Sequence, residues 1–201
     1  MHKEQIAELL YQAYETEKGG EKVYETALKC AENDELREEW EEYLEQTREH
    51  IEIVRGVMEV FGLDPDVETP GRLVVRHIGT SLVQAMDMAL DSGVPGAAQV
   101  VATECVVLAE TKDHLNWELI GMCGDKLKGD DGKALKEAYG KVEDQEDEHL
   151  YHTTGWCREL WIDSLGMPAQ LPPPEEAKDV KTAIGAARAK ASRKAKSKKS
   201  S

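Results

Sequence analysis

The feature that most constrains the fold of this chain is a repeat, because one helical pattern, Gln-x-x-Glu-His, occurs twice. It reads "LEQTREH" up to His50 and "EDQEDEH" up to His149. Each copy lies in a long segment where apolar residues recur every three or four positions, the periodicity of an α-helix. No period-2 pattern typical of a β-strand competes with it. The sequence therefore predicts an all-α protein in which a pair of helices occurs twice.

The breaks in the pattern predict four long helices and a helical crossover segment. Charged residues make up 32% of the 201 residues and aromatic residues 5%, a mixture that favours helix over sheet. The pair Gly19–Gly20 interrupts the first helix and permits another helix to approach closely. The predicted helices cover residues 2–31, 34–61, 97–122 and 133–165, and the crossover segment covers residues 72–91.

The repeat extends beyond the two histidine turns into the helix before each of them. Each half of the chain is a helix pair that carries Glu on its first helix and His on its second. The aligned pairs on the first helices are Glu17 with Glu110, Glu21 with His114, Tyr24 with Trp117, and Glu25 with Glu118. The sequence thus predicts an internal duplication.

The repeated acidic and histidine residues predict a metal site inside the bundle. Glu17 and Glu110 each begin a stripe with a four-residue spacing, and Glu146 and His149 are three residues apart, so that one turn presents both. Several carboxylates and imidazoles that converge in a bundle interior are very unfavourable unless they are compensated. Metal ions provide that compensation, and this mixture of ligands suits iron, manganese or zinc.

The combination of Glu17, Glu110 and "Glu146-Asp-Glu-His149" resembles the dimetal carboxylate site of ferritin-like proteins, in which two helices provide Glu and two provide Glu-x-x-His. The seven-residue spacing from Glu17 to Tyr24 is similar to the first helix of rubrerythrins. The resemblance covers about residues 5–165. It implies a ferritin-like four-helix bundle with a long helical crossover between helices two and three.

The resemblance also implies two bound metal ions, iron in preference to manganese, and no catalytic residue beyond the metal site. The implied ligands are Glu17, His50, Glu110, Glu146 and His149.

Thr47 departs from the family pattern, because it stands three residues before His50 where a Glu is expected. "Leu-Glu-Gln-Thr-x-x-His" is similar to the second helix of the stress-induced ferritin-like branch, which also tends to carry Thr. Glu49, Gln46 or His114 are candidates to replace the missing carboxylate. Alternatively, one of the two metal positions is weak or empty.

Several further residues are candidates for metal ligation or for contact with a ligand, and each also has an ordinary structural explanation. Glu21 and Glu25 are near enough to Lys18 and Lys22 for ordinary helical ion pairs. Tyr24 and Trp117 fit core positions as well as redox positions, and His152 fits a surface position. The full set is Glu21, Gln46, Glu49, His114, Glu118, His152, Tyr24 and Trp117.

The end of the chain differs from the rest in charge. The net charge is −15, yet residues 181–201 contain eight basic residues and no acidic one. We therefore expect a bundle over residues 1–168, a proline-rich strap over 169–180 and a disordered basic tail over 181–201. The tail either solubilises the protein, contacts the acidic body, or binds DNA without sequence specificity. The candidate polyanion-binding residues are Lys190, Arg193, Lys194, Lys196, Lys198 and Lys199.

These features lead to three hypotheses of function, the third of which is a helical bundle whose polar interior is a vestige. In the first, the chain is a dimetal protein, most simply di-iron, that handles iron and oxygen or peroxide in oxidative stress, as an oxidoreductase of the peroxidase or ferroxidase type. In the second, it binds or stores metal without turnover and contacts DNA through its tail.

The four cysteines form no CxxC pair and are expected to be buried, which together with the absence of a signal-peptide pattern favours a cytoplasmic protein without a membrane span. The resemblance suggests a homodimer.

Overall fold

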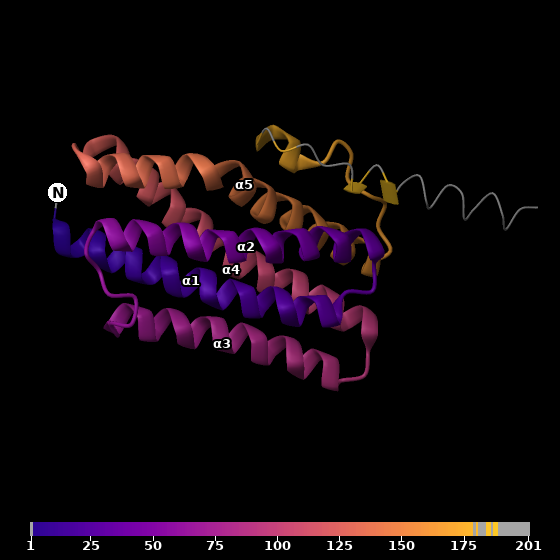
Figure 1. Cartoon of the computed structure of the whole chain (residues 1–201). Helices are drawn as coiled ribbons and strands as arrows, with labels where there is room; N and C mark the ends of the chain where they lie inside the picture. Colours follow the sequence, from indigo (N-terminus) through magenta and orange to yellow (C-terminus); the bar gives the residue numbers. More distant parts are fainter. Residues whose placement is uncertain (1, 179, 181–183, 186, 189–201) are drawn as a thin grey trace, which may run out of the picture.

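A computed structural model describes residues 2–178, 180, 184–185 and 187–188. In this part of the chain the secondary structure is entirely helical, as Figure 1 shows, so the prediction of an all-α fold is confirmed. The helices are α1 (Lys3–Cys30), α2 (Asp34–Val60), α3 (Pro70–Asp91), α4 (Pro95–Lys126), α5 (Asp130–Ser164) and the short 3-10 helix η1 (Pro174–Lys178).

Local capping signals place the helix ends. The Asn33 side chain accepts a hydrogen bond from the backbone N–H of Leu36 at 3.1 Å and begins α2, and Thr69 caps α3 in the same way. The predicted start of the third long helix was two residues late, because Pro95 has the φ angle that a first helical turn requires. The fourth was predicted three residues late, because α5 begins directly after Gly129, whose φ is +80°.

The crossover segment is a complete helix, α3, which packs along α1. A buried ion pair joins the two, with the Arg72 guanidinium 2.8 Å from the Glu15 carboxylate. A Cβ atom on Gly79 of α3 would lie only 3.6 Å from the Cα atom of Gly19 of α1. The expected role of the Gly pair is thereby confirmed at Gly19, since the helix backbones meet where neither has a side chain.

Two hydrophobic clusters divide the interior along the helix axes. On α1, one cluster contains Leu10 and Ala13 and the other begins at Val23, so Glu17 lies between them. On α2, α4 and α5 the ligand residues likewise lie between members of the two clusters. The apolar clusters therefore keep a polar layer in the middle of the molecule away from both ends.

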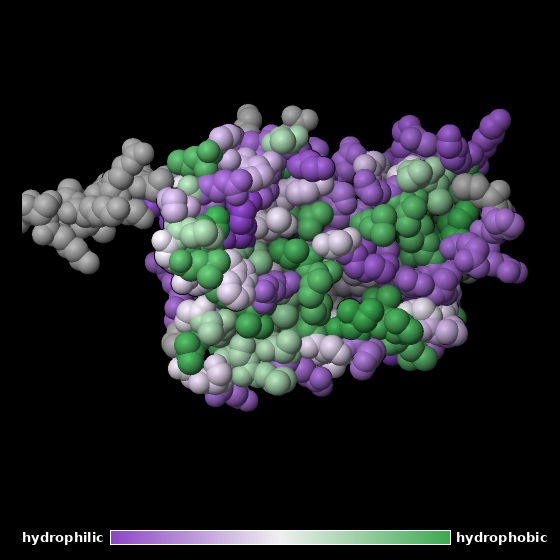
Figure 2. Space-filling view, turned by 180° about the vertical axis from the view of Figure 1, so that it is seen from behind, coloured by the Kyte–Doolittle hydropathy of each residue, from purple (hydrophilic) through white to green (hydrophobic). Residues whose placement is uncertain are grey.

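The outer side of α4 is apolar and exposed. Seen from behind, in Figure 2, apolar side chains lie at the surface among charged ones. Leu108, Leu115 and Met122 of α4 are 62%, 48% and 64% exposed and lie seven residues apart on one stripe. No described helix combines the length and the apolar character that a membrane crossing needs.

The cysteines meet the expectation only in part. Cys30 and Cys105 are buried, whereas Cys123 and Cys157 are only half-buried, and all four are free thiols. Burial raises the pKa of each of these thiols. The six candidate polyanion-binding residues lie outside the described residues.

Candidate metal centre

The structure brings the five residues of the implied ligand set together in the polar layer. Each belongs to at least one of two groups. Within a group, every residue offers one ligand atom, a nitrogen or an oxygen, and these atoms lie within 4.8 Å of one another. Glu146 belongs to both groups, and no member is more than 3% exposed. The groups, called triads below, are Glu17, His50 and Glu146, and Glu110, Glu146 and His149. Each triad could hold a metal ion, and two groups that share Glu146 are consistent with a dimetal site.

The two histidines are held by glutamines from the opposite half of the chain. His50 Nε2 lies 2.8 Å from Gln145 Oε1, and His149 Nε2 lies 2.7 Å from Gln46 Oε1. Each amide oxygen accepts a hydrogen bond from Nε2–H, so that in the neutral ring Nδ1 carries no proton and can bind a cation. Gln46, a candidate ligand, is thus placed against a histidine ring.

The nitrogen atoms left free in this way point at the carboxylates. His50 Nδ1 lies 3.1 Å from Glu146 and 3.4 Å from Glu17, yet it makes no aligned hydrogen bond. His149 Nδ1 lies 3.6 Å from Glu110 and 3.8 Å from Glu146. Nitrogen and oxygen atoms that converge at these distances could together hold a cation.

Two aromatic residues also act across the halves. Trp117 of α4 donates its indole N–H to Glu17 of α1 at 2.7 Å. Its counterpart Tyr24 of α1 is fully buried, and burial followed by the charge of Glu110 raises its pKa well above the usual value. These contacts fix the carboxylate of Glu17 and keep the Tyr24 phenol neutral beside Glu110.

Four ligand atoms have no hydrogen-bond partner in the described part of the chain. Three are carboxylate oxygens and one is an imidazole nitrogen, all inaccessible to solvent. They are Glu17 Oε2, Glu110 Oε2, Glu146 Oε2 and His50 Nδ1. A buried polar atom without a partner costs about 1–3 kcal/mol, and more when it is charged. The donor set therefore fits a pair of cations, which would satisfy all four atoms.

The electrostatics of the site also depend on the charges that converge there. Burial would lower the pKa of His50, but the carboxylates of Glu17 and Glu146 outweigh it and raise the pKa to about 11. Burial raises the pKa of Glu146 to about 7, with Glu110 and Glu17 adding to the effect. Without a metal, the imidazolium of His50 is the cation that balances the carboxylates.

Asp113 belongs to the same buried layer, and the sequence analysis missed it. It is 4% exposed, and its Oδ1 atom has no hydrogen-bond partner among the described residues. Burial, then the charges of Glu17, Glu146 and Glu110, raise its pKa well above the usual value. The signal was present in the repeat, because Asp113 aligns with Gly20 of the first half.

Thr47 is buried in the layer and leaves no carboxylate there. A Cβ atom on Gly20 would lie 3.5 Å from the Thr47 methyl group, so small residues fill this side. Glu49 is exposed, and His114 forms a 2.7 Å contact with Asp147. Neither joins a triad, so the expected replacements for the missing Glu do not lie in the triads.

The other candidates lie around the centre. Glu21 and Glu25 both pair with Arg48, at 2.9 and 3.1 Å, and not with the lysines expected from their spacing. The Tyr43 hydroxyl lies 2.6 Å from His152 Nδ1, and the Tyr43 ring packs 4.3 Å from that of His149. His152 is thus connected to the centre through an aromatic ring.

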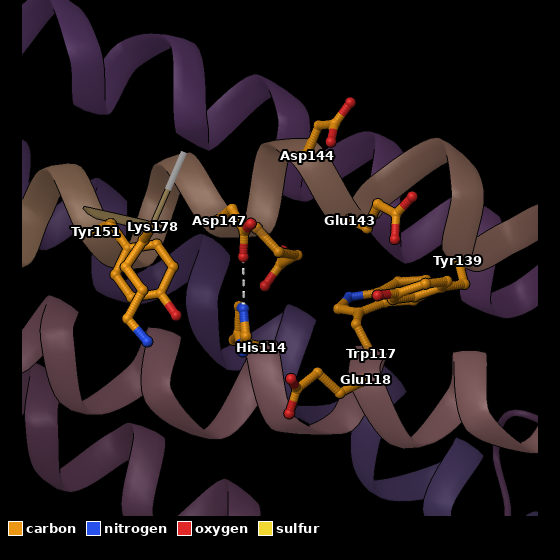
Figure 3. Close-up of a pocket in the computed structure, with 10 residues that line it drawn as sticks. His114, Trp117, Glu118, Tyr139, Glu143, Asp144, Asp147, Tyr151 and Lys178 are labelled. Carbon is orange, nitrogen blue, oxygen red and sulfur yellow. Dashed lines mark hydrogen bonds and ion pairs between the residues drawn. The ribbon is translucent and has the colours of Figure 1, made fainter. Parts of the chain in front are cut away.

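A surface pocket of about 280 Å³ opens between α4 and α5 and reaches the centre at Glu146. Figure 3 shows His114 facing Asp147 across it, with Glu118 and Glu143 nearby. Glu118, a candidate ligand, is exposed in this pocket.

The geometry thus defines a class of protein, an all-helical one with a buried carboxylate and histidine centre that could hold metal. The family model described as Domain of unknown function (DUF892) matches residues 2–103, about half of the 201 residues. The chain therefore belongs to the DUF892 family, a member of the ferritin-like superfamily. No curated protein and no solved structure matches it. Glu17 and His50 lie within the matched residues.

Proposed function

We propose that this chain is a dimetal carboxylate protein that binds two iron ions and handles iron and oxygen or peroxide. The observation that carries the proposal is the pair of buried triads that share Glu146. One ion would be held by Glu17, His50 and Glu146, and the other by Glu110, His149 and Glu146. Carboxylate and imidazole ligands suit iron, and manganese is the main competitor.

Charge balance supports two divalent ions and gives Asp113 a role. The three carboxylates of the triads carry a charge of −3 when ionised, and two divalent ions carry +4. Two nearby cations would counter the effect that raises the pKa of Asp113, so that this group would ionise and make the centre neutral. Asp113 thus provides the fourth carboxylate that Thr47 does not.

The surrounding residues prepare the centre for this chemistry. Gln46 and Gln145 orient the imidazoles, and the hydrophobic clusters on either side keep bulk water away. His50 must lose its proton when metal binds, so metal affinity should rise with pH.

Paired iron ions supply a centre that takes up or releases two electrons together. The chain has no CxxC pair of the kind that holds an electron-transfer iron, so the electrons for peroxide reduction would come from ferrous iron or another protein. Other expectations remain predictions: kinship with rubrerythrins or the stress-induced branch, the ferritin-like four-helix bundle, a cytoplasmic location, a homodimer, and DNA contact through the tail.

The experiment is peroxide consumption by the iron-loaded protein with excess ferrous iron as the reductant. A catalyst consumes many equivalents of peroxide per chain, with two ferrous ions oxidised for each peroxide reduced to water. A storage protein stops after it has been filled, which would support the non-catalytic alternative. The Glu146→Gln variant should lose the reaction, while Thr47→Val, which changes the equivalent position of the first half, should keep it.

A further inference from the structure

The pocket between α4 and α5 is strongly acidic. Its lining includes four carboxylates besides Glu146, and one lysine, which lies over an aromatic ring at 5.7 Å. The four are Glu118, Glu143, Asp144 and Asp147. A cleft lined by charge of one sign concentrates ions of the opposite sign and raises their association rate by 10- to 1000-fold.

The first half of the chain shows what the same surface looks like when it is closed. There, Arg48 of α2 reaches across to α1 and lies 2.9 Å from Glu21 and 3.1 Å from Glu25. Arg48 also lies 2.6 Å from Glu45 of its own helix. One guanidinium thus contacts three carboxylates and spans the groove between α1 and α2.

In the second half, the equivalent groove lacks this cation. Asp147 stands at the position of Arg48, and His114 and Glu118 stand at the positions of Glu21 and Glu25. His114 bridges to Asp147 at 2.7 Å, and Glu118 remains exposed. The repeat therefore places carboxylates and an imidazole around a point that a positive side chain occupies in the other half.

The inner wall of the pocket connects it to the dimetal centre. Glu146 lines the pocket, is 1% exposed, and its Oε2 atom has no hydrogen-bond partner in the described part of the chain. A cation in the pocket would meet Glu146 as the next ligand, since Glu146 both lines the pocket and belongs to both triads.

We propose that the α4–α5 pocket is a transit site, at which His114 and Asp147, with Glu118 in the same lining, attract a divalent transition-metal ion before it passes to Glu146. The mixed imidazole and carboxylate donors favour a transition metal over calcium or magnesium, which prefer oxygen alone. This inference rests on the proposed function, because it names the route to that centre. In the α1–α2 groove Arg48 occupies the equivalent position, so loading is expected from the α4–α5 side.

The test is the rate at which the metal-free, full-length protein takes up Co²⁺, followed by stopped-flow absorption. Asp147→Arg copies the closed surface of the first half, and its side chain position is 42% exposed, so the substitution is tolerated at the surface. We expect uptake at least tenfold slower with the same Co²⁺ content at equilibrium. Uptake by the wild type should also slow as salt is raised.

Two further variants separate the local effect from general ones. Glu41→Arg makes the same change of net charge at an exposed α2 position outside the pocket lining and should leave the rate within twofold of wild type. The double variant Glu118→Gln with Asp147→Asn keeps the shape of the pocket and should still slow uptake several-fold. It replaces the Asp147→Arg variant if that protein does not fold.

The outcomes distinguish this inference from the proposed function. If the wild type binds no Co²⁺ at equilibrium, both are overturned. If it binds two ions and both pocket variants load at the wild-type rate, only the transit site is overturned. A variant that loses rate and final content together would assign Asp147 to the centre itself and would also overturn the transit site.

Discussion

The two helix pairs, α1–α2 and α4–α5, share one framework and differ where charge is concerned. Both provide a Glu on the first helix and a Gln and a His four residues apart on the second. At three aligned positions the first pair is neutral or basic and the second is acidic: Gly20 with Asp113, Thr47 with Glu146, and Arg48 with Asp147. In the proposed function, the first pair would form a wall of the centre, and the second would provide its shared carboxylate and its opening.

The comparison also shows that neither half is sufficient. His50 is held by Gln145, and Glu17 receives its hydrogen bond from Trp117, so each half positions ligands of the other. A centre of this kind forms only when the two pairs pack together. Differences between the halves can therefore be tested by changing aligned residues in turn.

The largest effect is expected at Glu146, which belongs to both triads. Glu146→Gln should lower the affinity for both ions by more than about 100-fold, since loss of a ligand's outer partner alone costs 10- to 100-fold. Thr47→Val at the aligned position should change it little. Metal titrations by calorimetry measure both, and equal losses in the two variants would contradict a bridging role for Glu146.

A large effect on stability is expected where α3 covers α1. Glu15 is 5% exposed and pairs with Arg72 and Arg76, while its aligned residue on α4, Leu108, is 62% exposed. Glu15→Gln should lower the free energy of unfolding by about 3 kcal/mol, the loss expected for a broken buried ion pair. Leu108→Gln should change it by less than about 0.5 kcal/mol. Urea unfolding provides the comparison.

The ion pairs of Glu15 also predict that stability depends on pH in the acid range. Burial would raise the pKa of Glu15, but Arg76 and Arg72 outweigh it and lower the pKa from 4.5 to about 2. Because the folded value is the lower one, this contribution is present above pH 4.5 and is lost as the pH falls towards 2. Unfolding measured over that range should be less sensitive to acid in Glu15→Gln. An unchanged pH profile would show that the pair contributes nothing.

Substitution of either glutamine that contacts a histidine of the other half should weaken metal binding to an equal, intermediate degree. Gln46→Ala and Gln145→Ala each remove the acceptor that orients one imidazole. Each should weaken the binding of one metal ion by 10- to 100-fold, about 1.4–2.7 kcal/mol. Gln84→Ala at an exposed position of α3 serves as the control. A loss in only one variant would show that the halves orient their ligands differently.

The smallest effect is expected at Asp113, an acidic residue of the second half whose charge can be moved to Thr47 of the first half. Asp113→Asn should weaken binding of the second ion by about tenfold, or 1.4 kcal/mol, because the centre loses its fourth negative charge. Adding Thr47→Glu should restore that affinity by placing the charge in the first half. Asp87→Asn at an exposed position controls for net charge. Failure of Thr47→Glu to restore binding would leave Asp113 as a structural residue.

The sequence allowed the helices and the convergence of the five residues to be predicted, because both depend on periodicity and on identities between the halves. Asp113 was missed because the repeat was searched for identical or similar residues, and Asp113 aligns with a glycine, Gly20. The partner of Glu21 was predicted wrongly, because Arg48 lies on another helix and helical spacing reports only neighbours on the same one. Likewise, the hydrogen bonds of the glutamines depend on how the helix pairs pack.

The most direct test of the central claim is elemental analysis of the purified protein, as metal ions per chain. We expect two ions of iron per chain, or of manganese if that metal binds more tightly, one for each triad. One ion per chain would contradict two triads that share Glu146. No metal, together with unchanged thermal unfolding after a chelator is added, would contradict a metal centre altogether.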